Sequence, residues 1–128
     1  MEVEAVSVGL DLTLRELQTT LKKEGHPWEI SKAFPSSAVV GPWVQVKDFS
    51  EFENSEFTFS VNGKIRQKAK PSEMRLSVAE CIAHAKNHFM LCEGDIIFTG
   101  TPAGVSAVAA GDRSEISFGK IKFSVEWK

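Results

Sequence analysis

Hydrophobic and polar residues alternate along two stretches of the chain, and each stretch predicts a β-hairpin. Residues 57–67 read FTFSVNGKIRQ, with an Asn-Gly pair between two alternating runs. This pair favours a type I′ turn, because Asn and Gly both accept the positive φ that such a turn requires. Residues 113–127 alternate in the same way around a Gly-Lys pair and predict a second hairpin.

Three shorter apolar runs predict additional strands, at residues 5–10 (AVSVGL), 43–46 (WVQV) and 95–98 (DIIF). Short runs rich in β-branched and aromatic residues are typical of buried strands, and we expect the run at 95–98 to lie in the core. Residues 99–104 (TGTPAG) follow it directly. Two hydroxyls, two glycines and a proline are poor core material, so this segment is either a tight strand-to-strand turn or a binding element.

Two other stretches have the spacing of amphipathic helices. Residues 12–24 place leucines on one face, with Asp11 as the N-cap and Gly25-His26-Pro27 as the stop signal. Residues 77–90 predict a second helix with one buried apolar stripe, formed by Val78, Cys81, Ile82, Ala85 and Phe89. Strands nevertheless dominate, and no internal repeat or linker interrupts the pattern. We therefore predict a single domain, residues 1–128, of the α+β class and mainly β.

Composition and charge restrict the function classes. The chain is 42% hydrophobic and 25% charged, which is ordinary for a globular protein. Its formal net charge of −2 and pI of about 5.9 predict no nucleic-acid partner and no membrane partner. No apolar run approaches the roughly 20 residues of a membrane span, and the acidic start lacks the features of a signal peptide. Cys81 and Cys92 are too few for a disulfide framework, so we expect reduced thiols in a cytoplasmic compartment.

Helical spacing brings three polar residues together at the start of the first predicted helix. Asp11, Arg15 and Gln18 are at positions i, i+4 and i+7, which places them within about 60° of one another on a helix. One interpretation is an N-cap aspartate with a solvated ion pair. The other is that Asp11 binds a hard cation while Arg15 and Gln18 bind a carboxylate beside it. Lys32, in an otherwise apolar loop, is either solvent-exposed or part of the same site.

Four motifs, in this order and spacing, resemble the fumarylacetoacetate hydrolase family. They are GLDLTLRELQ at 9–18, KKEGHPWEISKAF at 22–34, VNGKIRQ at 61–67 and GDIIFTGTPAGV at 94–105. The resemblance implies the fumarylacetoacetase C-terminal-like fold, a mixed β-roll with a few short helices. It also implies a metal-dependent hydrolase, isomerase or decarboxylase. The implied substrates are α-keto or enol carboxylates such as acylpyruvates, 2-hydroxydienedioates and oxaloacetate.

The resemblance assigns roles to residues of this chain. Asp11 matches the family's aspartate metal ligand, and the implied cofactor is Mg²⁺, or Mn²⁺ or Ca²⁺ in its place. Arg15 and Gln18 match the polar pair that faces the substrate. Lys32 matches the catalytic, substrate-binding lysine near the metal.

The turn at residues 99–104 has a role in the family as well. Thr101 matches the second threonine of a Thr-Gly-Thr-Pro turn, whose hydroxyl and nearby backbone N–H groups hold a substrate oxygen. Gly100 and Gly104 allow the backbone to approach closely. The partners implied are a small keto acid and a second copy of the chain in a homodimer. The implied location is the cytoplasm or, for a eukaryotic protein with a longer N-terminus, the mitochondrion.

The sequence departs from the family pattern before Asp11. Family members have a Glu-x-Glu pair of metal ligands far upstream of this aspartate, whereas only ten residues precede it here. Glu2-Val3-Glu4 matches the pair locally and is either a ligand pair or an exposed acidic terminus. The family's lid, with its His/Glu acid–base pair, is absent too. We therefore expect the C-terminal two thirds of a catalytic domain: either an enzyme whose missing ligands come from elsewhere, or a catalytically inactive remnant that keeps the fold and the dimer interface.

A pair of histidines offers a competing metal site. His84 and His88 have the i, i+4 spacing of zinc-binding helices. No third ligand is evident, and both residues flank the apolar stripe of the predicted helix. We therefore interpret them as surface histidines.

Overall fold

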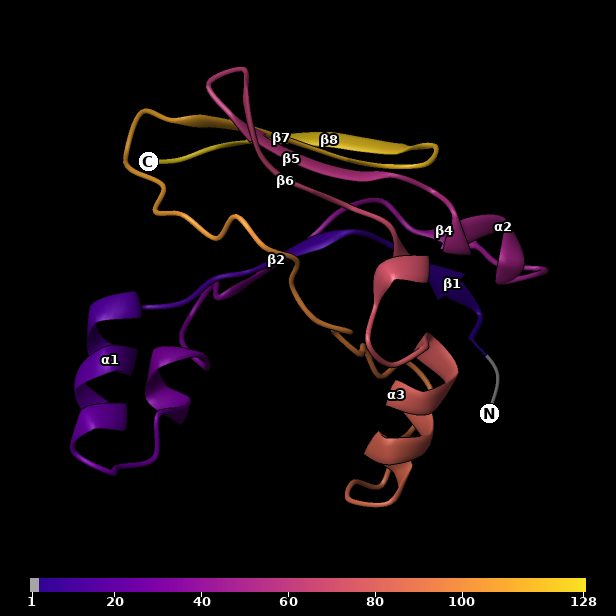
Figure 1. Cartoon of the computed structure of the whole chain (residues 1–128), viewed down its shortest axis with the longest axis horizontal. Coiled ribbons are helices and arrows are strands. Elements are labelled where there is room, and N and C mark those ends of the chain that lie inside the picture. The colour runs from indigo at the N-terminus through magenta and orange to yellow at the C-terminus, as the bar shows by residue number, and fades with distance from the viewer. Residues whose placement is uncertain (1–2) are drawn as a thin grey trace.

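The computed structural model describes residues 3–128 and consists mainly of short strands (Figure 1). The strands are β1 (Ala5–Val6), β2 (Gly9–Asp11), β3 (Ala38–Val40), β4 (Val44–Gln45), β5 (Phe57–Val61), β6 (Lys64–Ala69), β7 (Arg113–Phe118) and β8 (Ile121–Glu126). The helices are α1 (Arg15–Lys23), α2 (Ser50–Glu53) and α3 (Val78–Lys86), with two 3-10 turns, η1 (Glu29–Ser31) and η2 (Pro71–Glu73). This arrangement confirms the mainly-β α+β fold class. Across residues 3–128, every helix is too short to cross a membrane.

The largest sheet has four antiparallel strands in the order β6-β5-β7-β8. Its two outer pairs, β5–β6 and β7–β8, are the two hairpins predicted from the alternating pattern, and both predictions are confirmed. At the first turn, Asn62 has a φ of 50° and Gly63 a φ of 76°. Positive φ at both positions is what a type I′ turn requires, so the local sequence explains this turn.

The hydrophobic core lies on the inner face of this sheet. Alternate residues of the central strands β5 and β7 point inward, because successive side chains of a strand face opposite sides. Ile116 is fully buried, and the strand β2 contributes Leu10 to the same cluster. The two buried clusters are Leu10, Phe59, Val61 and Ile116, and Phe52, Phe118 and Ile121.

Two small antiparallel ribbons, β1–β4 and β2–β3, lie beneath the sheet. The single strand predicted at residues 5–10 is therefore wrong, because the chain leaves β1 after Val6 and enters a different ribbon at Gly9. A Cβ atom on Gly9 would lie 2.5 Å from the carbonyl oxygen of Val39, so glycine is needed where β2 and β3 approach each other.

Helix α1 begins later than its pattern predicts. It starts at Arg15, its N-cap residue Leu14 makes no side-chain capping bond, and Asp11 is instead the last residue of β2, paired with Ala38. The backbone N–H of Leu12 continues this strand pairing by donating to Ser37 O at 2.8 Å. The predicted N-cap role of Asp11, and its place on the helical face of Arg15, are therefore wrong.

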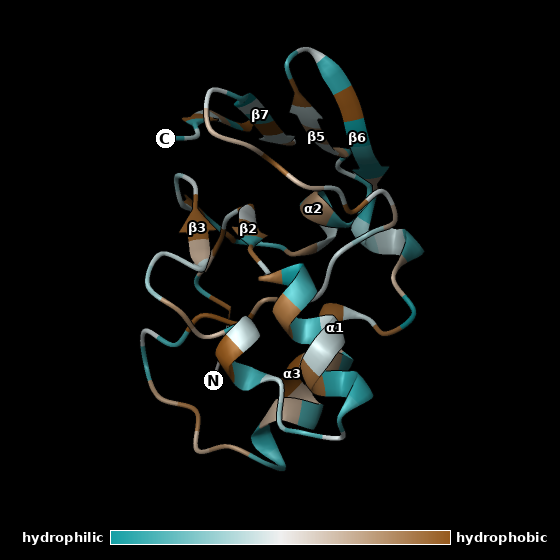
Figure 2. Ribbon diagram, turned by 90° about the vertical axis from the view of Figure 1, so that its left-hand side faces the viewer, coloured by the Kyte–Doolittle hydropathy of each residue, from teal (hydrophilic) through white to brown (hydrophobic). Residues whose placement is uncertain are grey.

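Helix α3 is present but its apolar stripe is uncovered. Ser77 caps the helix in a reciprocal pair with Glu80, and the helix ends at Lys86. None of its residues is buried, and Phe89, beyond its end, is 68% exposed. The predicted buried stripe is wrong because α3 has no extensive contact with another helix or strand of the described chain. In both Figure 1 and Figure 2, α1 and α3 lie on the same side of the four-stranded sheet.

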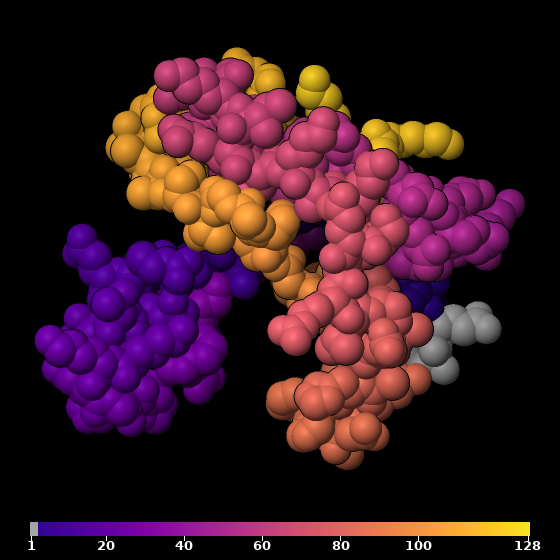
Figure 3. Space-filling model, viewed as in Figure 1, coloured from indigo at the N-terminus to yellow at the C-terminus, as the bar shows by residue number. Residues whose placement is uncertain are grey.

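The strand predicted at residues 95–98 is also wrong. The segment is extended but pairs with no strand among residues 3–128. Ile96 is 53% exposed and Phe98 is 44% exposed, so this apolar run is not in the core. Figure 3 shows the segment after residue 98, in orange, crossing above the hollow between α1 (indigo) and α3 (salmon).

Candidate active site

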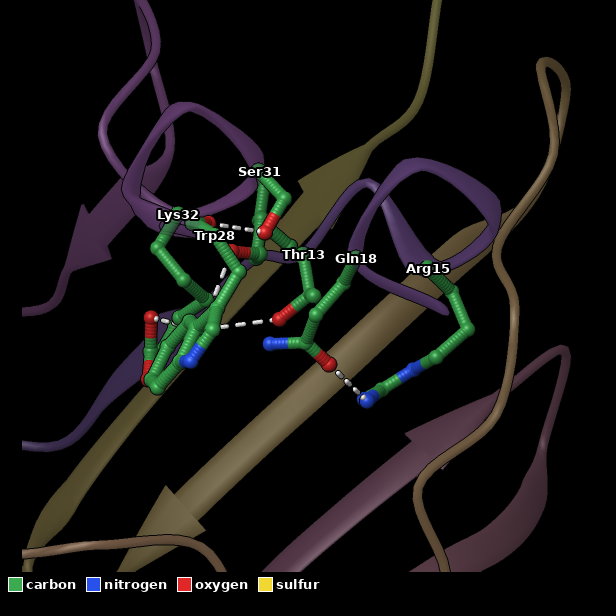
Figure 4. A network of polar contacts seen from close by, with 8 residues as sticks. Thr13, Arg15, Gln18, Trp28, Ser31 and Lys32 are labelled. Carbon is green, nitrogen blue, oxygen red and sulfur yellow. Dashed lines mark hydrogen bonds and ion pairs between the residues drawn. The ribbon is translucent and has the colours of Figure 1, made fainter. Parts of the chain in front are cut away.

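Asp11 and Lys32 form an ion pair at the point where β2 ends. Lys32 Nζ lies 2.6 Å from Asp11 Oδ1, 2.8 Å from Thr13 Oγ1 and 3.3 Å from the carbonyl oxygen of Leu12 (Figure 4). An ammonium group has three donors, and these three oxygens accept all of them. The side chain is therefore held in one position although it belongs to a loop.

The backbone around η1 fixes this position. Lys32 follows η1 directly, and the carbonyl of Ser31 accepts the N–H of Leu14 at 3.0 Å, which ties the loop to the exit of β2. Ser31 is fully buried, and its hydroxyl donates to the carbonyl of Trp28. Because both ends of η1 are anchored, Lys32 points at the Asp11 carboxylate rather than into solvent, and the interpretation of Lys32 as a solvated loop lysine is wrong.

Arg15 and Gln18 form a second pair on the first turns of α1. Arg15 Nη1 donates to Gln18 Oε1 at 2.7 Å (Figure 4). Gln18 is 7% exposed and is the buried residue of this helix, whereas Arg15 is exposed. The buried amide therefore holds one donor of a guanidinium that belongs to an exposed side chain.

Two of the four polar residues, Asp11 and Arg15, line a wide depression between α1 and α3. Lys32 and Gln18 do not line it, but each is bonded to one of these two residues. Gly100 and Thr101 line the same depression. Its volume is about 2200 Å³, whereas a site for a small molecule usually encloses about 300–1,000 Å³. It is therefore an open basin and not a closed pocket for a keto acid.

The turn at residues 99–104 is exposed and anchored to β6. Gln67 Nε2 donates to the carbonyl of Pro102 at 2.8 Å. Gly104 has a φ of 97°, and a Cβ there would lie 1.9 Å from the carbonyl oxygen of Arg66, so only glycine fits. Gly100 has a φ of 119°, and a Cβ atom placed there would have no other atom within 4 Å. Because no strand precedes or directly follows the segment, the interpretation as a strand-to-strand turn is wrong.

Among Asp11, Arg15, Gln18 and Lys32 positive charge exceeds negative charge, although the depression as a whole is also lined by Glu4, Glu16, Glu73, Glu93 and Asp95 against Lys68, Lys70 and Arg75. Lys32 and Arg15 contribute two positive charges against one from Asp11, and the guanidinium has a planar fork that matches a carboxylate. Arg15 is the charged group that is free to meet such a ligand, since Lys32 already donates to three oxygens.

The fit to a divalent cation is incomplete. Oxygen donors such as Asp11 and Thr13 suit Mg²⁺ or Mn²⁺, but residues 3–128 contain no group of three His, Cys, Asp or Glu side chains that could hold a metal. Glu4 is exposed and its carbonyl pairs with the N–H of Val46, whereas Glu2 lies outside the described residues. The rings of His84 and His88 are 4.5 Å apart and exposed, with no third ligand in the described part of the chain.

Sequence reasoning missed Thr13. The helical spacing applied to Asp11 directed attention to positions i+4 and i+7, whereas this part of the chain is extended. In an extended chain residues i and i+2 share a face, so the Asp-Leu-Thr order itself was the signal that Thr13 lies beside Asp11.

The chain is similar to proteins of a known family. The family model described as fumarylacetoacetate (FAA) hydrolase C-terminal matches residues 2–125. Oxaloacetate tautomerase YcgM of Escherichia coli is 36% identical over 117 residues, which cover 91% of this chain and 53% of that protein. The chain thus spans about half the length of the curated relatives it matches.

Solved structures of related proteins superpose on nearly the whole of this chain. A fumarylacetoacetate hydrolase family protein from Yersinia pestis superposes with a TM-score of 0.92 at 34% identity, covering 98% of this chain and 58% of that one. The fumarylpyruvate hydrolase of Pseudomonas aeruginosa, in complex with Mn²⁺ and pyruvate, superposes with a TM-score of 0.88 at 36% identity over 98% and 55% of the two chains. These neighbours confirm the fumarylacetoacetase C-terminal-like fold, and the chain belongs to the fumarylacetoacetate hydrolase family.

Proposed function

We propose that this chain carries the keto-acid-binding part of a divalent-metal-dependent enzyme that acts on α-keto or enol carboxylates. Family members include an oxaloacetate tautomerase and a fumarylpyruvate hydrolase whose structure holds Mn²⁺ and pyruvate. The substrate class is therefore acylpyruvates, 2-hydroxydienedioates or oxaloacetate, and the reaction is hydrolysis, isomerisation or decarboxylation. In this proposal residues 1–128 form one domain that corresponds to the C-terminal part of the catalytic domain.

The observation that carries the proposal is the adjacency of the Asp11–Lys32 and Arg15–Gln18 pairs at the rim of one depression. Arg15 binds the substrate carboxylate through the guanidinium donors that Gln18 does not use. Gln18, which is buried behind it, keeps the guanidinium in the binding orientation. A pre-oriented guanidinium loses less side-chain entropy on binding than a free one.

Lys32 provides positive charge beside the reacting carbonyl. When a bond to the adjacent carbon breaks or a proton leaves it, negative charge develops on the carbonyl oxygen, and a fixed ammonium stabilises that charge. Its three oxygen contacts hold the ammonium in place before the reaction, so no reorganisation is needed at the transition state.

Thr101 and Gly100, which line the same depression, provide further donors for a ligand oxygen. The Thr101 hydroxyl and the backbone N–H groups of residues 100 and 101 make no hydrogen bond within the described residues, so all of them are free to donate to a ligand oxygen. Hydrogen bonds from an open loop of this kind contribute about 0.5–1.5 kcal/mol each.

Asp11 is the cation ligand that this chain contributes, with Mg²⁺, Mn²⁺ or Ca²⁺ as the ion. The cation supplies Lewis acidity toward the keto-acid oxygens. One carboxylate is too few to bind such an ion tightly, so further ligands come from outside residues 3–128.

The same shortage supports a second candidate function. A family remnant that keeps the fold, the Arg15 anion site and a homodimer interface would bind keto acids weakly without turning them over. The two candidates differ in whether added metal strengthens ligand binding, because only the enzyme uses the cation to hold the substrate.

Calorimetric titration of oxalate, a stable keto-acid analogue, tests the proposal. We expect oxalate to bind in the presence of Mg²⁺ and to bind at least tenfold more weakly to the Arg15→Met variant, which loses the charged fork. Arg113→Met, at an exposed position of β7, is the matched control and should bind as the parent does. Equal oxalate affinity in all three proteins contradicts the proposal.

A further inference from the structure

A β-bulge interrupts the pairing of β5 with β6 at Arg66. Ser60 pairs with Ile65, and the preceding residue of β5, Phe59, pairs with Gln67. Arg66 is thus an extra residue without a partner on β5. Residues directly opposite each other in an antiparallel pair share one face of the sheet. In a regular ladder Arg66 would lie opposite the buried Phe59, and the bulge puts Gln67 on the inner face in its place.

The bulge separates two side chains that a regular strand would place on one face. Ile65 and Gln67 are two positions apart, which is the period of a strand. Ile65 is nevertheless 63% exposed, whereas Gln67 is 7% exposed. Burial favours an isoleucine, and a buried amide costs free energy unless it is hydrogen-bonded. Hydrophobic burial therefore does not explain the choice of Gln67, and bulges recur beside functional sites, where they redirect one side chain.

Gln67 uses its amide to hold the turn at residues 99–104. Its Nε2 donates to the carbonyl of Pro102 at 2.8 Å, and this is the one hydrogen bond that residues 96–108 make within the described chain. The turn also rests against the bulge, because a Cβ atom on Gly104 would overlap the carbonyl oxygen of Arg66. The turn is thus attached to β6 at two successive residues, the bulged one and Gln67.

Holding the Pro102 carbonyl also restricts Thr101. The pyrrolidine ring fixes φ of Pro102, and a residue that precedes a proline is confined to extended conformations. A segment with so few free dihedral angles transmits the position of the carbonyl to its neighbour. Thr101 lines the depression, as Gln67 does. The Gln67 amide therefore determines where the Thr101 hydroxyl lies in the depression.

We propose that Gln67 is a positioning residue of the keto-acid site and orients the Thr101 hydroxyl through the Pro102 carbonyl. This role rests on the proposed function, because it belongs to the same site. Without the hydrogen bond, the turn would have to be ordered when the ligand binds, and the loss of conformational freedom would weaken binding. With it, the turn is ordered beforehand, so Gln67 supports binding although its donor goes to Pro102 and not to the ligand.

The Gln67→Met variant tests this role. Methionine has a similar length and suits a position opposite the buried Phe59, so the variant should fold, but it cannot donate to Pro102. Amide order parameters of residues 99–104, measured by NMR relaxation, should fall below about 0.6, the flexible range, while those of β5 and β7 stay unchanged. Oxalate affinity in Mg²⁺ should fall about three- to tenfold, because the turn then has to be ordered on binding.

Two controls separate positioning from stability. Ser117→Ala removes the hydrogen bond of 2.6 Å between Ser117 Oγ and Thr58 Oγ1, which lies in the same sheet and outside the depression. This variant should change stability without changing oxalate affinity. In a Thr101→Val background, Gln67→Met should weaken oxalate binding less than it does in the parent, because the hydroxyl that it positions is gone.

Three results with a parent that binds oxalate overturn the positioning role and leave the proposed function standing. The first is a turn that keeps its order parameters in Gln67→Met. The second is a disordered turn with the oxalate affinity of the parent. The third is an equal loss of oxalate affinity in the parent and Thr101→Val backgrounds, as a purely structural glutamine would give. A parent that binds no oxalate in Mg²⁺ overturns the proposed function and the positioning role together.

Discussion

The ammonium of Lys32 lies 2.6 Å from Oδ1 of Asp11, although the two residues are 21 positions apart in the sequence. The pair joins the end of strand β2 to the loop after η1, and the anchoring of that loop through Leu14 and Ser31 creates it. Asp11 is thus neutralised by a cation of its own chain. In the proposed enzyme the same carboxylate also binds a metal ion, so Lys32 and the metal ion compete for the Asp11 carboxylate.

Lys32→Met removes the shared ammonium. We expect oxalate affinity in Mg²⁺ to fall, because the ligand loses the positive charge that Lys32 holds near it, although Lys32 makes no direct hydrogen bond to the ligand. Affinity for Mn²⁺ alone should rise, because Asp11 then has no competing cation. Calorimetry with each ligand separately checks both signs. If oxalate and Mn²⁺ affinities both stay at the parent values, Lys32 has no part in the site.

Asp11→Ala tests the metal assignment directly. We expect the weak binding of Mn²⁺ by this chain to disappear while the fold is kept, because Asp11 is exposed and contributes no core packing. Loss of the ion pair with a partly exposed Lys32 should lower the free energy of unfolding by about 1 kcal/mol or less. Glu126→Ala, at an exposed position of β8, is the control. Unaltered Mn²⁺ binding by Asp11→Ala rules out this ligand.

Thr101→Val keeps the side-chain shape and removes the hydroxyl donor. Because Thr101 is exposed and its hydroxyl has no partner in the described chain, thermal stability should stay the same. Oxalate affinity should fall by about 0.5–1.5 kcal/mol, the value of one hydrogen bond. Ligand-dependent shifts of the melting temperature measure both quantities together. Thr20→Val on the exposed side of α1 serves for comparison, and equal shifts in the two variants would contradict the assignment.

The stability of α3 should depend on pH through Glu80. The backbone N–H and hydroxyl of Ser77 donate to this carboxylate at 2.7 and 2.8 Å, and these bonds, the backbone one first, lower the pKa of Glu80 below its ordinary 4.5. A lowered folded-state pKa means that the stabilisation is complete above pH 4.5 and is lost as the pH falls through the folded-state value. The protection of the α3 amides, taken as the exchange rate relative to the intrinsic rate at each pH, should therefore fall in this acidic range.

The Glu80→Gln variant provides the control for this effect. Glutamine retains an acceptor oxygen but does not titrate, so the α3 amides of this variant should lose less protection in acid than those of the parent. If parent and variant respond to acid alike, the capping pair is not the titrating element.

Self-association is expected when nothing else covers the depression. Its exposed apolar side chains favour pairing of two copies, which fits the homodimer that the family resemblance implies. Sedimentation velocity over a wide concentration range should show a dimer that grows with concentration, and Ile96→Asp should weaken it. A clean monomer at every concentration would contradict this prediction.

Local patterns in the sequence determined the parts of the fold that depend on neighbours in the chain. The Asn62-Gly63 turn and the alternating strands around it are explained by preferences within a few residues, and so is the capping of α3 by Ser77. The order of four motifs also identified the family. Each of these signals is complete within a short stretch, so no knowledge of the tertiary structure was needed.

The tertiary structure decided the rest, because those features depend on partners distant in sequence. Asp11 is a strand residue because Ala38 pairs with it, and Lys32 faces it because η1 is anchored beside β2. The apolar run at residues 95–98 looks like a core strand, yet it has no partner strand and stays exposed. The hydrophobic pattern indicates which residues tend to be buried, whereas only the three-dimensional arrangement determines whether another strand or helix lies against them.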